Sequence, residues 1–262
     1  MHNDLLFFTD KGKAYQIKMY DIPEGKRATR GKSIMNFLSL AQDEKVTSIL
    51  PMPKEIKKGD DISLMLITRQ GTGKRVAIDS FKDVRRSGII AISLDDGDGL
   101  ISASFVSGKD SMILVATDAQ SIRLSIDEIR EMGRAAGGVR AMKLDKGVNI
   151  VAAIPVKADS KDDAELLTVS ANGYGKKTSL SEYKIQGRGG SGIKTFKVTD
   201  KTGELMAAQV VIPEIDEIVA ISKKSQVIRC ELKEIPNLGR DTQGVRVMKL
   251  REGDSLASVI GV

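Results

Sequence analysis

The chain has 262 residues, 41% of them apolar and 29% charged, a balance typical of a soluble globular protein with a sizeable core. No apolar run approaches the ~18–20 residues of a membrane helix. The start, Met1–Asp4, shows no signal peptide, and the single cysteine, Cys230, excludes an internal disulfide framework, so we expect a cytoplasmic protein. The net charge of +6 is compatible with a polyanionic partner, whereas 4% aromatic residues without Trp disfavour single-strand binding by base stacking.

A four-residue turn recurs five times along the chain. It lies at Thr9–Gly12, Thr68–Gly71, Ala116–Ala119, Ser170–Gly173 and Ser222–Ser225, and its last residues are 59, 48, 54 and 52 positions apart. A second glycine follows 17 or 19 residues later, at Gly31, Gly88, Gly138, Gly192 and Gly244. One large apolar residue stands ten after each turn: Ile22, Phe81, Ile129, Tyr183 and Ile235. This spacing predicts five copies of one unit of about fifty residues.

Each copy is expected to form β-strands. After the turn, apolar and polar residues alternate, with apolar positions at Tyr15/Ile17/Met19, Ile122/Leu124/Ile126 and Ile228/Cys230/Leu232. Period two with one apolar face indicates a half-buried strand. A further strand is expected after the second glycine, as in residues 138–144 and 244–250. Only Ser125–Glu128, which resembles a capping box, indicates a short helix.

Repeated units of this kind predict an all-β fold, a propeller-like disc of about five four-stranded blades. Stacking on neighbours then buries the second face of each unit. The chain is expected to be one domain, residues 1–262, with repeats at about 4–56, 61–108, 109–157, 164–213 and 215–262. A six-blade disc that lacks its first blade is the alternative.

Cations recur at two places in the repeat. The fourth residue after the turn is Gln16, Arg75, Arg123, Lys177 or Arg229, preceded in two copies by Lys74 and Lys176. The second-glycine region carries Arg27, Arg30, Lys32, Arg85, Arg86, Arg134, Arg188 and Arg240, and three copies add Arg140, Lys194 and Arg246 two residues after the glycine. By the strand alternation, the fourth position is expected to face outward, and all these cations are predicted to contact DNA.

Repetition around a disc would place these cations on a common edge. A basic rim suits a bent duplex, because each neutralised phosphate releases a counterion. Glycines allow backbone N–H groups to approach phosphates, and arginines can bind them bidentately. No segment resembles a base-reading helix, so we expect binding driven by phosphate contacts and DNA deformability. At any single position, a surface cation that serves only solubility is the competing explanation.

Four segments carry a family resemblance. They are Tyr15–Pro23 with Arg30–Gly31, Glu128–Arg134 with Gly138–Arg140, Asn172–Thr178, and Gly239–Val245. Through them the chain resembles the C-terminal domain of the DNA gyrase A protein over essentially its whole length. The resemblance implies a β-pinwheel, whose blades exchange hairpins, that wraps double-stranded DNA with a positive crossing. We expect the isolated domain to be monomeric. It implies presentation of that DNA to the N-terminal cleavage core of the same polypeptide, for supercoiling driven by ATP hydrolysed on the gyrase B protein.

The resemblance also has a departure. The family's box, Gln-Arg-Arg-Gly-Gly-Lys-Gly, usually stands in the first repeat, but the first copy here does not contain it. We therefore expect a box-bearing first repeat to be missing from this sequence, either trimmed or never present. The fourth copy contains a box-like variant, Gln186, Gly187, Arg188, Gly189, Gly190, Ser191 and Gly192. Gly187 replaces an arginine and Ser191 the lysine. We therefore expect DNA binding with weakened or incomplete wrapping.

Catalytic and metal sites are not expected. His2 is the only histidine and lies at the terminus, so no internal triad can use it. Cys230 is predicted to be a buried structural thiol. Asp95–Asp98 lacks the glutamate of a calcium loop and is expected to be a β-turn. We expect no cofactor, no membrane contact and no catalytic activity in this chain.

Two rival functions stay open. The C-terminal domain of the topoisomerase IV counterpart of gyrase A shares the blades but usually lacks a recognisable box, so Gln186–Gly192 favours gyrase. A protein-binding propeller would need no basic rim and would not bind DNA at physiological salt. A catalytic propeller ranks third, because the repeats show no convergent acids or histidines.

Overall fold

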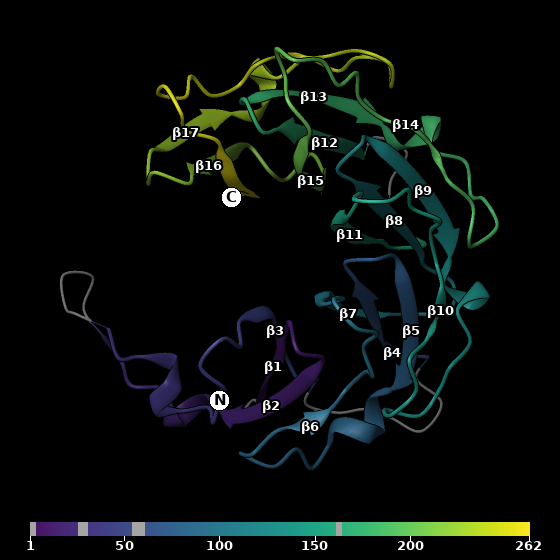
Figure 1. Ribbon diagram of the computed structural model, residues 1–262, viewed down its shortest axis with the longest axis vertical. Coiled ribbons are helices and arrows are strands. Elements are labelled where there is room, and N and C mark those ends of the chain that lie inside the picture. Colours follow the sequence, from purple (N-terminus) through teal and green to yellow (C-terminus); the bar gives the residue numbers. More distant parts are fainter. Residues whose placement is uncertain (1–3, 26–30, 54–60, 161–163) are drawn as a thin grey trace. The chain divides into compact units, whose positions relative to one another are not determined.

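The computed structural model describes residues 4–25, 31–53, 61–160 and 164–262 (Figure 1). It divides into two compact units. The N-terminal unit comprises Met1–Gly108 and Ile129–Val139, and the C-terminal unit comprises Lys109–Glu128 and Arg140–Val262. Arg27, Arg30 and His2 lie outside the described residues.

Short strands make up the N-terminal unit. They are β1 (Asp4–Thr9), β2 (Lys13–Lys18), β3 (Val46–Pro51), β4 (Ser63–Thr68), β5 (Thr72–Ala77), β6 (Ile89–Ile90) and β7 (Leu100–Val106), with β10 (Val139–Arg140) where the chain passes from one unit to the other. The 3-10 turns η1 (Met19–Asp21), η2 (Ile34–Asn36) and η3 (Ile78–Phe81) connect some of them.

The C-terminal unit continues the same order. Its strands are β8 (Ser111–Ala116), β9 (Gln120–Ser125), β11 (Ile150–Val156), β12 (Glu165–Ser170), β13 (Tyr174–Ser179), β14 (Ile193–Lys194), β15 (Leu205–Val211), β16 (Glu217–Ser222), β17 (Val227–Glu231), β18 (Val245–Arg246) and β19 (Leu256–Gly261). Its 3-10 turns are η4 (Ile126–Glu128), η5 (Leu180–Glu182) and η6 (Leu232–Glu234). Across the described part of the chain, no helix has the length and hydrophobicity needed to span a bilayer.

The strands form antiparallel sheets in the orders β3-β1-β2-β6, β10-β5-β4-β7, β11-β8-β9-β14, β15-β12-β13-β18 and β17-β16-β19. Each of the four-stranded sheets takes three strands from one repeat and one edge strand from the next repeat (Figure 1). These edge strands are β6, β10, β14 and β18. In the C-terminal unit, for example, β14 pairs with β9, with Ile193 opposite Ser121. The all-β prediction is confirmed, and so is the exchange of strands between neighbouring blades.

The five turns share one backbone conformation. The last residue of each turn has a positive φ, from 63° to 84°, and its N–H donates to the carbonyl three residues earlier at 2.9–3.1 Å. Three of these residues are glycines, but Ala119 and Ser225 adopt the same left-handed conformation with a side chain. This closes a tight hairpin and sets the register of the two strands that it joins.

Apolar cores lie between adjacent sheets. Leu6 and Phe8 of β1 meet Leu64 and Leu66 of β4 in the N-terminal unit. The C-terminal unit, which holds the third, fourth and fifth of the sheets given above, has equivalent clusters between the third and fourth and between the fourth and fifth. Because β12 packs toward the third sheet through Leu166 and toward the fifth through Leu167 and Val169, five of its six residues are buried rather than alternate ones.

The predicted alternation holds at some positions and fails at others. Tyr15 and Ile17 are buried in β2, but the strand ends at Lys18, so Met19 lies in η1 and is exposed. Cys230 is half-buried, not fully buried as predicted, because β17 lies at the edge of its sheet. The short helix expected at Ser125–Glu128 is the 3-10 turn η4.

Candidate nucleic-acid interface

Three loops cross the outer strand of the preceding repeat in the same way. We call them the first arch (residues 132–138), the second arch (186–192) and the third arch (238–244). Before each arch, the chain forms a parallel bridge with that strand: Glu131 with Arg75, Ile185 with Arg123, and Asn237 with Lys177. After each arch, the chain pairs with the start of the same strand as β10, β14 or β18. Both ends of an arch are therefore fixed on one strand.

The last residue of each arch has to be glycine. Gly138, Gly192 and Gly244 all have positive φ. A Cβ there would lie 2.8, 2.3 and 2.2 Å from the carbonyl oxygens of Gly73, Ser121 and Gly175, respectively. Since real Cβ atoms do not approach oxygens so closely, the second glycine marks this backbone crossing in three of its five copies. Of the other two, Gly88 has a positive φ and lies against the Tyr15 ring, and Gly31 has no atom within 4 Å of its Cβ position.

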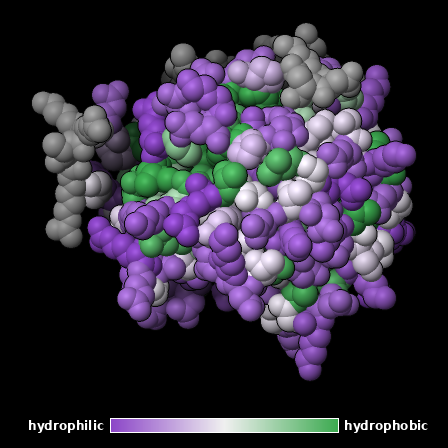
Figure 2. All heavy atoms as spheres, turned by 90° about the horizontal axis from the view of Figure 1, so that it is seen from above, coloured by the Kyte–Doolittle hydropathy of each residue, from purple (hydrophilic) through white to green (hydrophobic). Residues whose placement is uncertain are grey.

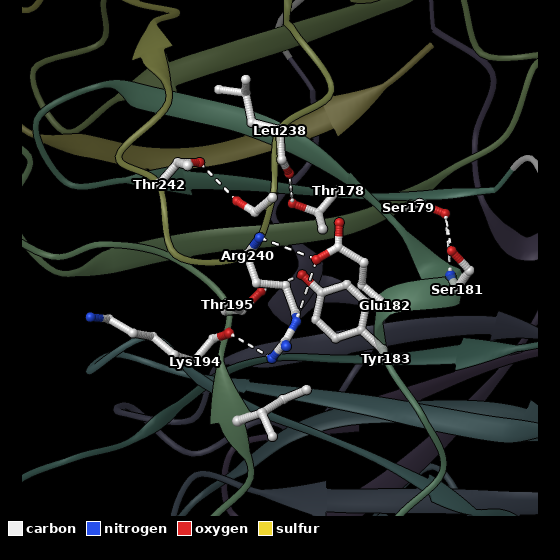
Figure 3. Close-up of polar contacts among 12 residues, drawn as sticks. Thr178, Ser179, Ser181, Glu182, Tyr183, Lys194, Thr195, Leu238, Arg240 and Thr242 are labelled. Carbon is white, nitrogen blue, oxygen red and sulfur yellow. Dashed lines mark hydrogen bonds and ion pairs between the residues drawn. The ribbon is translucent and has the colours of Figure 1, made fainter.

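The second and third arches attach their arginines by the same contacts. In the third, the Arg240 N–H donates to Glu182 Oε2 at 3.3 Å and the guanidinium donates to the Lys194 carbonyl at 3.4 Å (Figure 3). In the second, the Arg188 N–H donates to Glu128 Oε2 at 2.5 Å and its guanidinium to the Arg140 carbonyl at 3.4 Å. Arg188 is exposed and Arg240 half-exposed, so both stay available to a ligand from outside.

The sequence interpretation missed Glu128 and Glu182. Both stand nine residues after the turn of their repeat, a recurrence that is visible in the sequence. Their role depends on an arch that belongs to the next repeat, so their own neighbours in the chain do not reveal it. They hold the arginine backbone and offset part of its charge.

The box-like segment forms the second arch. The Gln186 N–H donates to the Arg123 carbonyl at 2.8 Å, and the Gly189 N–H donates to the Ala141 carbonyl at 2.7 Å. The Gly190 carbonyl accepts from the Lys143 N–H at 2.9 Å. Gly187 and Ser191, which replace the family's arginine and lysine, are both exposed. Arg188 is therefore the one cation that this seven-residue segment presents.

The cations of the strand positions are tied to neighbouring groups within the protein. Lys177 pairs with Glu165 at 2.8 Å, and Arg229 pairs with Glu217. Arg123 is half-buried and donates from Nε to Ser111 Oγ at 2.9 Å. Burial lowers the pKa of Arg123 below its usual value. Arg75 is also half-buried and interacts with another group of the protein. The outward orientation predicted for this position is thus only partly correct.

Lys74 and Lys176 are not on the surface. Both side chains are fully buried, which corrects the prediction that they add surface charge and contact DNA. Desolvation by burial lowers the pKa of each to about 8. A fully buried ammonium group cannot reach a phosphate without a rearrangement, so neither lysine belongs to a contact surface in this structure.

The remaining cations reach the surface. Arg134 of the first arch is half-exposed, and the exposed set is Lys32, Arg85, Arg86, Arg140, Lys194 and Arg246. Lys194 pairs with Asp241 at 2.9 Å, and Arg86 lies 3.6 Å from Asp21. Arg246 donates to the Tyr174 hydroxyl at 2.8 Å and stacks on its ring. The face drawn in Figure 2 is mainly hydrophilic, with hydrophobic side chains in separate patches.

Within the described ranges, no group of three or more His, Cys, Asp or Glu residues is arranged to hold a metal ion. Asp95–Asp98 forms a turn in which the Asp98 N–H donates to the Asp95 carbonyl at 3.1 Å, as expected. The Cys230 thiol has a raised pKa because of burial, with a smaller contribution from Glu234. A raised pKa disfavours the reactive thiolate.

Comparisons with known proteins also divide this chain into five repeated segments. The chain matches the family described as "DNA gyrase C-terminal domain, beta-propeller" over residues 3–51, 63–107, 110–157, 164–212 and 216–262. The chain belongs to this family. Its five matched segments follow the five repeats, and the β-propeller class confirms the predicted blade architecture.

Two curated relatives illustrate the relation. The DNA gyrase A protein of Mycolicibacterium smegmatis is 36% identical over 98% of this chain, and that of Staphylococcus epidermidis is 35% identical over 100% of it. The chain spans only 30% and 29% of those relatives. The recognised family is therefore that of a part of the gyrase A protein.

Solved structures give the same result. A DNA gyrase A C-terminal domain matches with a TM-score of 0.82 and 30% identity, covering 99% of this chain and 82% of the other. The C-terminal domain of a DNA topoisomerase IV matches with a TM-score of 0.89 but at 22% identity, covering 100% of this chain and 79% of the other. The second match shows a shared fold only.

Proposed function

We propose that this member of the gyrase family binds double-stranded DNA along its arches and wraps it, without catalysing any reaction itself. The observation that carries the proposal is the recurrence of one arch, built on successive repeats, that presents Arg134, Arg188 or Arg240. A duplex has phosphates at regular intervals, so a repeated cationic element can contact it repeatedly without reading bases.

The relatives support a proposal for the role in the parent enzyme. As part of a gyrase A protein, this chain would pass wrapped DNA to the N-terminal cleavage core for ATP-dependent negative supercoiling with the gyrase B protein. The protein would then act in the cytoplasm, bound to chromosomal DNA. The two charges absent from the second arch, at Gly187 and Ser191, are expected to weaken the wrap.

Topoisomerase IV is the closest alternative. The C-terminal domain of a topoisomerase IV shares the fold of this chain at 22% identity. A shared fold at that identity is not evidence of a shared function. Relatives named as gyrase A proteins reach 34–37% identity over almost the whole chain, and the box-like second arch is a gyrase feature by resemblance. These observations favour gyrase.

Duplex binding tests the proposal directly. A labelled duplex and a single strand of the same sequence are titrated with the 262-residue chain by fluorescence anisotropy at several salt concentrations. We expect duplex binding that is insensitive to sequence and weakens steeply with salt, since phosphate contacts release counterions. Absence of duplex binding at low salt would contradict the proposal and favour a protein-binding propeller.

A further inference from the structure

The third residue after the turn lies beneath each arch. This residue is Lys74 under the first arch, Ile122 under the second and Lys176 under the third. It sits between the two strand positions that hold the ends of the arch, so its side chain is the one that can fill the space below. All three side chains are fully buried.

Lys74 fills the first arch with an ammonium group. Its Nζ donates to the Ala136 carbonyl at 2.9 Å, to the Arg134 carbonyl, and to the Ala91 carbonyl at 2.8 Å. All three N–H donors of the ammonium thus have a backbone acceptor, and two of these acceptors belong to the arch. The first arch lacks the glutamate contact of the others, because Ser80 stands nine after its turn.

Lys176 repeats the arrangement in the C-terminal unit. Its Nζ donates to the carbonyls of Gly239 and Arg240 at 2.5 and 2.6 Å. The ammonium also lies 5.8 Å from the centre of the Phe196 ring, which supplies a cation–π contact. In both arches, the lysine binds the carbonyl oxygen of the very arginine that the arch presents.

The fold itself does not require a lysine at this position. Ile122 fills the second arch, and a Cβ on Gly190 would lie 3.5 Å from its Cδ1, an ordinary packing distance. Burying an ammonium disfavours its charged form, as the lowered pKa values of Lys74 and Lys176 indicate. A costly group retained where an apolar one fits points to a role other than filling space.

We propose that Lys74 and Lys176 are positioning residues of the DNA-binding surface, whose buried ammonium groups hold the arch carbonyls inward and so fix the backbone that presents Arg134 and Arg240. The proposal rests on the proposed function. Neither lysine touches DNA; each acts through the arginine above it. The positive charge beneath the arch also offsets the inward carbonyl dipoles.

The test compares Lys74→Met, Lys176→Met and the double variant with the unsubstituted chain. Methionine approximates the length of lysine and removes the charge and the donors. Lys157→Met is the charge-matched control, because Lys157 pairs with Asp110, outside the three arches. Thermal unfolding establishes that each variant is folded. Duplex affinity, its salt slope, and hydrogen exchange of the arch amides are then measured.

We expect the double variant to bind duplex about tenfold more weakly, because the first and third arches lose the charge-assisted hydrogen bonds that hold their carbonyls. Amide exchange should accelerate in the first and third arches but not in the second. Lys157→Met should leave both the affinity and the exchange near those of the unsubstituted chain. Unchanged affinity and exchange in a folded double variant would overturn the proposal. If the unsubstituted chain binds no duplex, the proposed function fails, and this proposal fails with it.

The pH profile of duplex affinity gives a second readout. Arg134 faces Lys74, and Glu182, Asp241 and Arg240 face Lys176. Carboxylates and guanidinium groups ordinarily titrate outside the range from pH 7 to about 9.5. Duplex affinity of the unsubstituted chain should therefore fall as pH rises through about 8 and the lysines lose their protons. A flat profile would contradict the proposal, whereas the double variant should be flat across this step.

Discussion

The Glu182 carboxylate meets Arg240 twice, at the backbone N–H (3.3 Å) and at the guanidinium Nε (3.4 Å) (Figure 3). The two residues come from different repeats, so this contact fastens the third arch to the preceding blade. Glu128 does the same for the Arg188 N–H. Arginines held this way need little reorganisation to meet a phosphate.

Replacing Arg134, Arg188 and Arg240 together with Ala is expected to flatten the salt dependence of duplex binding. If each arginine neutralises one phosphate, the slope of log affinity against log salt falls by roughly 0.9 per arginine. The measurement is fluorescence anisotropy over a salt series. An unchanged slope would refute the assignment of these arginines to phosphate contacts.

The arch glycines are expected to tolerate no side chain. Gly192→Ala places a Cβ 2.3 Å from the Ser121 carbonyl oxygen at a φ of 82°, so it should lower the free energy of unfolding by at least about 2 kcal/mol. Gly187→Ala, in the same arch but with no atom within 4 Å of its Cβ, should change it by less than about 0.5 kcal/mol. Urea unfolding measures both. If both variants lost the same free energy of unfolding, the close contact of Gly192 with the Ser121 carbonyl would not be the cause of the loss.

Glycine should stabilise the last turn. Ser225 is exposed and has a φ of 63°, a conformation that costs a residue with a side chain about 1 kcal/mol. Ser225→Gly is thus expected to raise the free energy of unfolding by about 0.5 kcal/mol. Ala119→Gly, at the same turn position, should gain less because the Ala119 methyl is buried. A loss of stability in Ser225→Gly would contradict this account of the turn.

Sequence reasoning recovered much of the fold. The turns recur because each needs a left-handed last residue, which is a local requirement. Gly192 and Gly244 recur because another strand crosses there, and the large apolar residues Phe81, Ile129, Tyr183 and Ile235 recur because they are buried. The exchange of strands followed from family resemblance rather than from spacing. The burial of Lys74 was not predicted, since its acceptors, the carbonyls of Arg134 and Ala136, are about sixty residues away and carry no side-chain signal.

The candidate interface was less predictable for the same reason. Lys177 and Arg229 were predicted to face outward and contact DNA, and in the structure Glu165 and Glu217 on the adjacent strand pair with them. Both acids stand eight residues before the last residue of their turns, whereas the second and third repeats have serine at that position. Once the strand register is known, the sequence therefore shows which cations have an acidic partner. Arg188 of the box-like segment is exposed, and its contact with DNA stays a prediction.

The buried lysines predict a pH dependence of stability. Their pKa is about 8 in the folded state against 10.5 as the ordinary value. Between these values the folded state binds fewer protons than the unfolded state, so each lysine's contribution to the free energy of unfolding rises with pH. From pH 7 to about 9.5, the unsubstituted chain should gain about 2 kcal/mol per lysine relative to the Lys74→Met/Lys176→Met variant. Urea unfolding of both proteins at the two pH values gives the difference, and a difference independent of pH would mean that the pKa values of the lysines are not depressed.

DNA topology tests the central claim, which is wrapping of duplex around this chain. Nicked circular DNA is sealed by ligase with increasing amounts of the protein, and the linking number is read after the protein is removed. A positive shift that grows with protein concentration is the predicted result, reduced by the absent cations of the second arch. Salt-sensitive binding with no shift in linking number would contradict wrapping and leave a chain that binds DNA without bending it into a chiral path.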